Sequence, residues 1–93
     1  MVTISSGVNL VRCGKIRTLS IINPASLTAQ TFNLPLETDY PPIEINTVGR
    51  RNSESNVGII RITPDGFVYH MQVSGAIANF NNQCRYTATW IVE

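Results

Sequence analysis

The sequence is poor in charge and has no long apolar run. Charged residues make up 14% of the chain, against roughly 25% in an ordinary globular domain. The net charge of +1 comes without a basic cluster, which argues against a general nucleic-acid or membrane-surface binder. No apolar run approaches the roughly 18 residues of a membrane span, and the first residues resemble no signal peptide. The sequence therefore predicts a protein made in a cytosol, with no nucleic-acid partner and no membrane insertion.

Residues that carry chemistry are also scarce. Cys13 and Cys84 lie far apart and match no metal-ligand spacing, which predicts two free, partly buried thiols and leaves a disulfide between them as the alternative. Glu37 and Asp39 could offer oxygen atoms to a hard cation, but the further ligands and the glycine of a calcium loop are missing. No carboxylate pair marks a glycosidase, and the glycines form no phosphate-binding loop. We therefore predict no catalytic residue, no metal site and no cofactor.

What the sequence does contain is a β pattern without convincing helical periodicity. β-Branched residues alternate with turn residues at close spacing, which predicts an all-β fold. We expect one domain over residues 1–93, a small antiparallel, jelly-roll-like β-sandwich of about seven to eight strands. The expected strands are 2–5, 8–13, 15–22, 28–34, 43–48, 57–63, 67–73 and 85–92.

Turn chemistry divides these strands. The segment Thr63-Pro64-Asp65-Gly66 is the best hairpin signal, because proline presets one turn residue and Asp-Gly supplies a positive φ. The polar stretches 49–56 and 74–83 are expected to be loops, the first at an exposed tip. In the last strand Tyr86 and Trp90 share one face, which predicts a role in the core or in a subunit interface.

The segment 34–42 is bracketed by prolines. Pro35 must end a strand because it has no N–H for the ladder, and the pair Pro41-Pro42 forces an extended exit. We therefore expect a stiff loop between two strands. Tyr40 is its best candidate for contact with a ligand, because a tyrosine ring offers a rigid amphipathic face.

Four more residues are candidates for a saccharide site on the basis of residue type and expected exposure. Arg50 and Arg51 would meet anionic groups through their guanidinium forks, and the amide of Asn52 would bond hydroxyls. His70, the one histidine, is interpreted as a surface or interface residue of its strand. With Tyr40 these residues form the predicted ligand-binding set.

Several short motifs occur in a characteristic order along the chain. They are Val11-Arg12-Cys13-Gly14-Lys15-Ile16-Arg17-Thr18-Leu19-Ser20-Ile21, Phe32-Asn33-Leu34-Pro35, Tyr40-Pro41-Pro42, Gly58-Ile59-Ile60-Arg61-Ile62, Asp65-Gly66-Phe67-Val68 and Arg85-Tyr86-Thr87-Ala88-Thr89-Trp90. In this order the chain resembles the small β-sandwich domains at the C-termini of bacteriophage tail-fibre, baseplate and receptor-binding proteins. It departs from them in the spacer 36–39, which lacks a glycine, and in Tyr69, His70 and Met71, where simpler aliphatic residues are usual.

The resemblance implies a homotrimeric, non-enzymatic head of a viral adhesion device. Such a head binds host bacterial surface saccharide, has other tail or baseplate proteins as partners, and belongs to the virion after synthesis in the bacterial host cytoplasm. The chain would then be this domain alone or a C-terminal fragment of a longer fibre or baseplate protein. A non-binding structural or trimerisation module is the alternative, with Phe67, Met71, Tyr86 and Trp90 in subunit contacts. A hydrolase of cell-wall polymer is ranked last.

Overall fold

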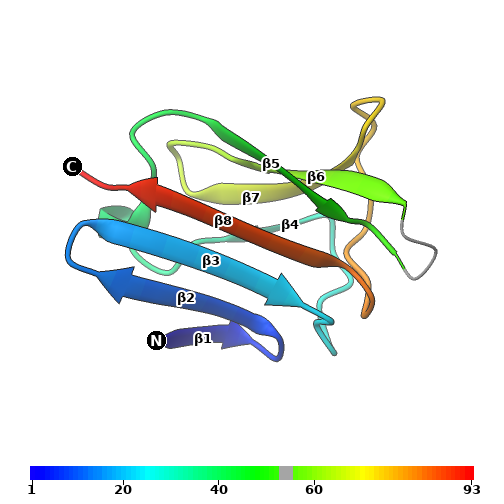
Figure 1. Ribbon diagram of the computed structural model, residues 1–93, viewed down its shortest axis with the longest axis horizontal. Helices are drawn as coiled ribbons and strands as arrows, with labels where there is room; N and C mark the ends of the chain where they lie inside the picture. The colour runs from blue at the N-terminus through cyan, green and yellow to red at the C-terminus, as the bar shows by residue number, and fades with distance from the viewer. Residues whose placement is uncertain (53–55) are drawn as a thin grey trace.

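The structure is a computed structural model that describes residues 1–52 and 56–93. Its strands are all antiparallel and form one sheet with the order β1-β2-β3-β8-β5-β6-β7-β4. They are β1 Val2–Ser5, β2 Val8–Cys13, β3 Ile16–Ile22, β4 Thr31–Asn33, β5 Ile45–Arg50, β6 Val57–Ile62, β7 Phe67–Gln72 and β8 Arg85–Ile91, with one 3-10 turn, η1, at Glu37–Asp39. The sheet curls so that β7 and β4 lie behind β3 and β8 (Figure 1). The predicted all-β antiparallel fold is confirmed, and the curled sheet is compatible with a small β-sandwich.

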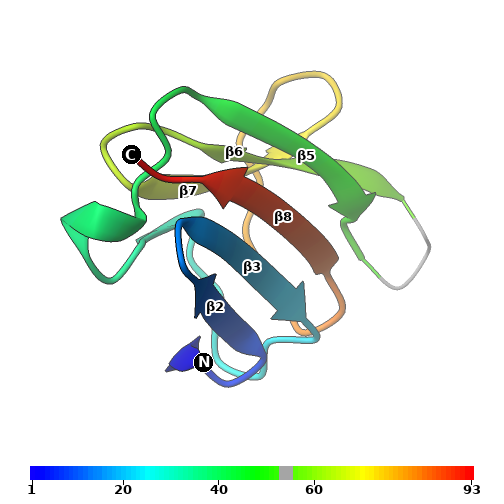
Figure 2. The same ribbon diagram turned by 60° about the vertical axis from the view of Figure 1, so that its left-hand side comes forward.

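The inner faces of the curled sheet meet in one hydrophobic core, and Figure 2 shows how the strands wrap around it. The buried residues of this core are Val8, Leu10, Leu19, Ile21, Leu34, Ile60, Ile62, Val68, Phe80, Cys84, Tyr86, Ala88, Trp90 and Val92. Alternation along β8 is strict, so every second side chain from Tyr86 onward points inward. Tyr86 and Trp90 are therefore core residues. The alternative that placed them in subunit contacts is wrong for both, and also for Met71, which is buried as well.

The hairpin between β6 and β7 has the predicted turn. The N–H of Gly66 donates to the carbonyl of Thr63 at 2.9 Å, and the N–H of Thr63 donates to the carbonyl of Phe67 at 3.0 Å. Gly66 has a φ of 85°, a conformation that glycine adopts without steric cost. The local sequence was sufficient here because the turn depends only on its own residues.

Several predicted strand boundaries are wrong, including both ends of the strand expected at 43–48, which runs from Ile45 to Arg50. Gly49 and Arg50 belong to β5, paired with Gly58 and Val57, and are not loop residues. A side chain at Gly49 would collide with the carbonyl oxygen of Arg85 and with the ring of Tyr86, so this glycine allows a close approach of strands rather than a turn. The rest of the expected tip includes residues 53–55, which lie outside the described part of the chain.

The strand β4, Thr31–Asn33, is also shorter than the strand expected at 28–34. The second half of β7 is covered instead by the loop that follows it. Met71 forms a bridge with Ile77, and the N–H of Ala78 donates to the carbonyl of His70 at 2.9 Å. Residues 74–83 thus fold back along the edge of the sheet and cover His70.

Both cysteines are free thiols, as predicted. The expected partial burial is wrong for both, because Cys13 is exposed at the end of β2 and Cys84 is fully buried in the core. The disulfide that the sequence left open does not form between them. Within the described residues, no helix has the length and apolar character needed to cross a bilayer.

Candidate functional site

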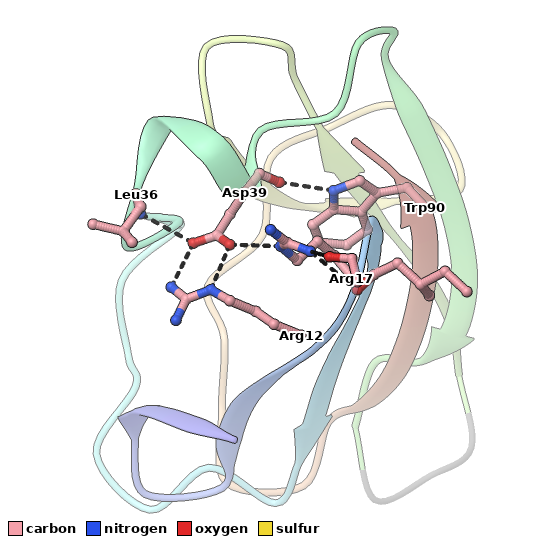
Figure 3. A network of polar contacts seen from close by, with 7 residues as sticks. Arg12, Arg17, Leu36, Asp39 and Trp90 are labelled. Atoms are coloured by element: carbon pink, nitrogen blue, oxygen red, sulfur yellow. Dashed lines mark hydrogen bonds and ion pairs between the residues drawn. The ribbon is translucent and has the colours of Figure 1, made fainter. Parts of the chain in front are cut away.

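The proline-bracketed loop is fixed by the buried carboxylate of Asp39, at the end of η1 (Figure 3). Its Oδ1 accepts hydrogen bonds from Nε of Arg12 and Nε of Arg17, both at 2.7 Å. Its Oδ2 accepts from Nη2 of Arg12 at 2.7 Å and from the N–H of Leu36 at 3.2 Å. The Arg12 contact is a two-point guanidinium–carboxylate pair, which is among the stronger polar contacts in proteins. Both carboxylate oxygens are therefore occupied.

These contacts set the charge state of Asp39. The hydrogen bonds from Arg12 hold the pKa of the Asp39 carboxyl below its ordinary value, against the opposing effect of burial, and Arg17 adds to the shift. An ionised carboxylate with both oxygens taken by arginines cannot coordinate a cation. The idea that Asp39 joins Glu37 as a cation ligand is therefore wrong. Across the described residues, no three or more histidine, cysteine, aspartate or glutamate side chains are grouped to hold a metal ion.

The same loop is bonded to the last strand. The indole Nε1 of Trp90 donates to the backbone carbonyl of Asp39 at 2.8 Å, and Nη1 of Arg17 donates to the carbonyl of Gly14 at 2.7 Å. Side chains from β2, β3 and β8 thus converge on η1, as Figure 3 shows. The prolines restrict the path of this loop, and the Asp39 network anchors it to the sheet.

Tyr40 follows directly and is half-buried. A Cβ placed on Gly66 would lie 2.6 Å from Cδ1 of the Tyr40 ring, so the ring packs against the bare backbone of the β6–β7 turn. The ring also lines an open groove of about 690 Å³. The residues around this groove are Glu37, Thr38, Tyr40, Pro41, Pro42, Pro64, Asp65, Val92 and Glu93.

The chemistry of the groove is that of an aromatic ring with hydrogen-bond acceptors. Glu37, Asp65 and Glu93 line the groove, and no arginine, lysine or histidine among the described residues does so. Ionised carboxylates accept hydrogen bonds and attract positive charge. The groove is therefore suited to hydroxyl or ammonium groups presented on a compact ligand.

Arg50 and Arg51 lie far from this groove. Figure 1 places η1 at one end of the molecule and the last residues of β5 at the other. Nε of Arg50 donates to the carbonyl of Gln83 at 3.0 Å, and its Nη2 donates to Oδ1 of Asn23 at 3.2 Å. These bonds draw the guanidinium across the start of β8. Arg50 is thus positioned by the protein itself.

Arg51 points elsewhere, because consecutive side chains of an extended chain alternate in direction. Its Cβ and Cγ lie beside Gly58, close to the hydroxyl of Tyr86, and its Nε is buried without a hydrogen-bond partner among the described residues. Arg50 and Arg51 therefore have different surroundings, and their expected contact with anionic groups stays a prediction. Asn52 is half-buried and has an interaction of its own.

His70 is not a surface residue, so this expectation is wrong. Its side chain is fully buried and stacks on Phe80 with ring centroids 4.6 Å apart. Nδ1 lies 2.9 Å from the carbonyl oxygen of Asn79, and Nε2 lies 2.6 Å from the hydroxyl of Tyr86. Because a carbonyl only accepts, Nδ1 carries the proton and the Tyr86 hydroxyl donates to Nε2. His70 faces inward with Val68, and the fold-back of residues 74–83 closes over it.

Burial shifts the pKa values of both His70 and Tyr86. It lowers the pKa of His70, and the nearby charge of Arg51 lowers it further, against the bond to Asn79. Burial also raises the pKa of the Tyr86 phenol. His70 is therefore neutral at physiological pH and belongs to the core rather than to a ligand site.

Of the predicted ligand-binding set, Tyr40 lines this groove, whereas Arg50, Arg51, Asn52 and His70 do not. The carboxylates beside it were missed, since nothing local indicates that the loop 35–42 meets the turn at Gly66. The sequence does hold one signal for these carboxylates, because Glu37 and Asp65 each lie within two residues of a proline in a stiff loop. Comparison with protein-family models, with curated proteins and with solved structures found no match, so a functional assignment must come from the residues and geometry described above.

Proposed function

We propose that this protein is a non-enzymatic adhesion module that binds saccharide at the groove beside Tyr40, and that it acts as a bacteriophage head domain recognising a host bacterial surface. The observation that carries this proposal is the Tyr40 ring, packed on Gly66 at the edge of a groove of about 690 Å³. Grooves of roughly 300 to 1,000 Å³ are typical of small-molecule sites. One or two sugar units would fit such a space.

Three properties support a sugar over other small ligands. The tyrosine ring provides an apolar face for the C–H groups of a pyranose. The rim carboxylates accept hydrogen bonds from hydroxyls. The loop is held in place by Asp39 before any ligand arrives, so little ordering free energy is lost on binding.

The charge of the rim narrows the choice of sugar. With Glu37, Asp65 and Glu93 at the rim and no basic residue in the lining, a carboxylate or phosphate on the ligand would be repelled. A neutral sugar or an amino sugar is therefore preferred over a uronic acid. Arg50 and Arg51, which we expected to contact anionic groups, lie at the opposite end of the molecule from this groove.

The test is a binding titration of the purified protein with a matched series of glucose, glucosamine and glucuronic acid, together with adsorption to host cells. We expect Tyr40→Ala to weaken sugar binding by about threefold to tenfold, the range of an aromatic contact of roughly 0.5–1.5 kcal/mol. Tyr69→Ala is the matched control, because Tyr69 is also half-buried but does not line the groove. Unchanged sugar binding and unchanged cell adsorption in Tyr40→Ala would contradict the proposal. Release of reducing ends from purified wall polymer would favour the hydrolase instead.

A specific observation also favours the second candidate, a structural or trimerisation module of a tail fibre or baseplate. Ile16 and Ile91 are direct cross-strand partners on the outer face of β3 and β8, and they are 45% and 66% exposed. Val48 is exposed on the neighbouring strand β5. Exposed aliphatic side chains that adjoin one another on a sheet face are typical of surfaces covered by another protein.

A further inference from the structure

The start of β8 carries two arginines in direct register. Arg50 of β5 is the cross-strand partner of Arg85 of β8, and Ile22 of β3 flanks Arg85 on its other side. Arg85 is exposed, since it lies on the outer face of β8, opposite to the buried Tyr86. Like charges that face each other directly across antiparallel strands destabilise the pair. This arrangement therefore costs free energy unless a negative group lies nearby.

The carboxylates of residues 1–52 and 56–93 do not provide that group. Asp39 is taken by Arg12 and Arg17, and Glu44 lies 3.6 Å from Arg61. The remaining carboxylates of these residues line the groove at the opposite end, as described above. Within the described chain, Arg50 and Arg85 thus form no ion pair.

The donors at this position are already oriented. The bonds from Arg50 to the carbonyl of Gln83 and to Oδ1 of Asn23 fix its guanidinium while using only part of its N–H donors. Asn23 has a φ of 44°, a left-handed conformation that asparagine tolerates better than most residues. With its oxygen engaged by Arg50, the exposed Asn23 amide keeps its N–H donors for other partners. The arrangement offers many donors and positive charge to one group.

We propose that Arg50 and Arg85, together with the amide of Asn23, form a binding site for an oxyanion, a phosphate or a carboxylate group carried by a polymer. Guanidinium forks match the geometry of both groups and bind them through paired hydrogen bonds. This inference goes beyond the proposed function, because the site lies at the opposite end from the groove and does not require the groove to bind sugar.

The site predicts a specific response to anions. Inorganic phosphate and acetate are compared with chloride at equal ionic strength, and the melting temperature and the amide NMR shifts of residues 23, 50 and 85 are followed. An anion that binds only the folded state raises the melting temperature. We expect phosphate, acetate or both to raise it more than chloride does, and the more effective of the two identifies the group that the site prefers.

Arg85→Gln gives the decisive comparison. Loss of this fork should weaken anion binding by about tenfold or more, the usual effect of removing a charged hydrogen-bond partner. At low ionic strength without added anion, the same substitution should raise the melting temperature, because it removes the like-charge pair. If Arg85 were only solvated, Arg85→Gln would change neither anion binding nor the melting temperature at low ionic strength.

Arg61→Gln is the matched control, since Arg61 is a strand arginine that already has a carboxylate partner. It should keep the full phosphate response, and so should Tyr40→Ala. The proposal is overturned if wild-type protein responds to phosphate and acetate no more than to chloride. It is also overturned if Arg85→Gln responds as wild type does, or if its melting temperature at low ionic strength does not rise.

Discussion

At the scale of single residues, the fold depends most visibly on the charge state of His70. The neutral imidazole accepts a hydrogen bond from Tyr86 and donates one to the carbonyl of Asn79. Burial keeps its pKa below the ordinary value. The unfolded chain, in which the histidine is hydrated, therefore binds a proton more readily than the folded chain does.

This difference predicts how stability varies with pH. Because the folded pKa is depressed, the contribution of His70 is complete above the unfolded pKa of about 6.5 and is lost progressively as the pH falls below that value. We expect the free energy of unfolding to fall between pH ~7 and pH ~5, with a slope of at most about 1.4 kcal/mol per pH unit. Urea titrations across this range measure it.

His70→Gln is the control for that experiment. The chain has one histidine, so the variant should be less stable than wild type but should lose the pH dependence in this window. A slope that persists in His70→Gln would show that another group is responsible. Asp39 does not contribute to the slope in this pH range, because its depressed pKa places its titration at lower pH.

At the scale of structural elements, the Asp39 network decides whether η1 and the following loop keep their place on the sheet. Asp39→Asn keeps the shape of the side chain but removes its charge, which leaves the buried guanidinium of Arg17 without a counter-ion. Breaking a buried ion pair in this way costs about 3–5 kcal/mol. We expect a loss of this size in the free energy of unfolding, measured by urea denaturation at neutral pH.

Asp65→Asn is the matched control, because Asp65 is exposed, and it should change stability by less than about 0.5 kcal/mol. A loss below about 1 kcal/mol in Asp39→Asn would contradict the role given to the network. Since the pKa of Asp39 is depressed in the folded state, its contribution is present above the unfolded value of about 3.9 and is lost as the pH falls through the folded pKa. Wild-type protein should therefore approach the stability of the variant only in strong acid.

The elements themselves could be predicted from the sequence because their signals are local. Alternation in β8 and the Pro64-Asp65-Gly66 turn involve neighbours in the chain. The pairing of Asp39 with Arg12 and Arg17 joins residues more than twenty positions apart, and no local pattern indicates it. The burial of His70 was missed for the same reason, since it depends on the fold-back of residues 74–83.

At the scale of the whole molecule, the principal extents are 36 × 25 × 18 Å, and the two candidate sites lie at opposite ends. Carboxylates surround the groove near η1, and Arg50 and Arg85 meet near the β5–β6 hairpin. The sequence showed a net charge near zero but could not show this separation, because it arises from which strand ends are adjacent in the sheet.

The exposed aliphatic residues on the outer face of the sheet lead to a prediction for the mass of the native protein in solution. If the face around Ile16 and Ile91 is covered by further copies, as the trimerisation reading requires, the mass in solution should be three times 10.3 kDa. Ile91→Lys places a charge on that face and should shift the species toward the monomer. Val73→Lys is the control, since Val73 is comparably exposed but lies beyond the end of β7. A monomeric wild-type protein in native mass measurements would argue against this reading and against the homotrimeric head.

The contact of Tyr40 with Gly66 separates the residues that support the ring of Tyr40 from those that only line the groove. Gly66 packs against the Tyr40 ring and is buried, as is the neighbouring Asp39. Glu37 and Asp65 are exposed, and their side chains form no hydrogen bond or ion pair with the residues that the structure describes. Substitutions at these two rim positions can therefore alter the charge and reach of the groove while the supports stay intact. If the groove binds sugar as proposed, one or two substitutions at the rim would change which sugar it prefers without a need to restabilise the sheet, and randomising the rim alone would do the same by design.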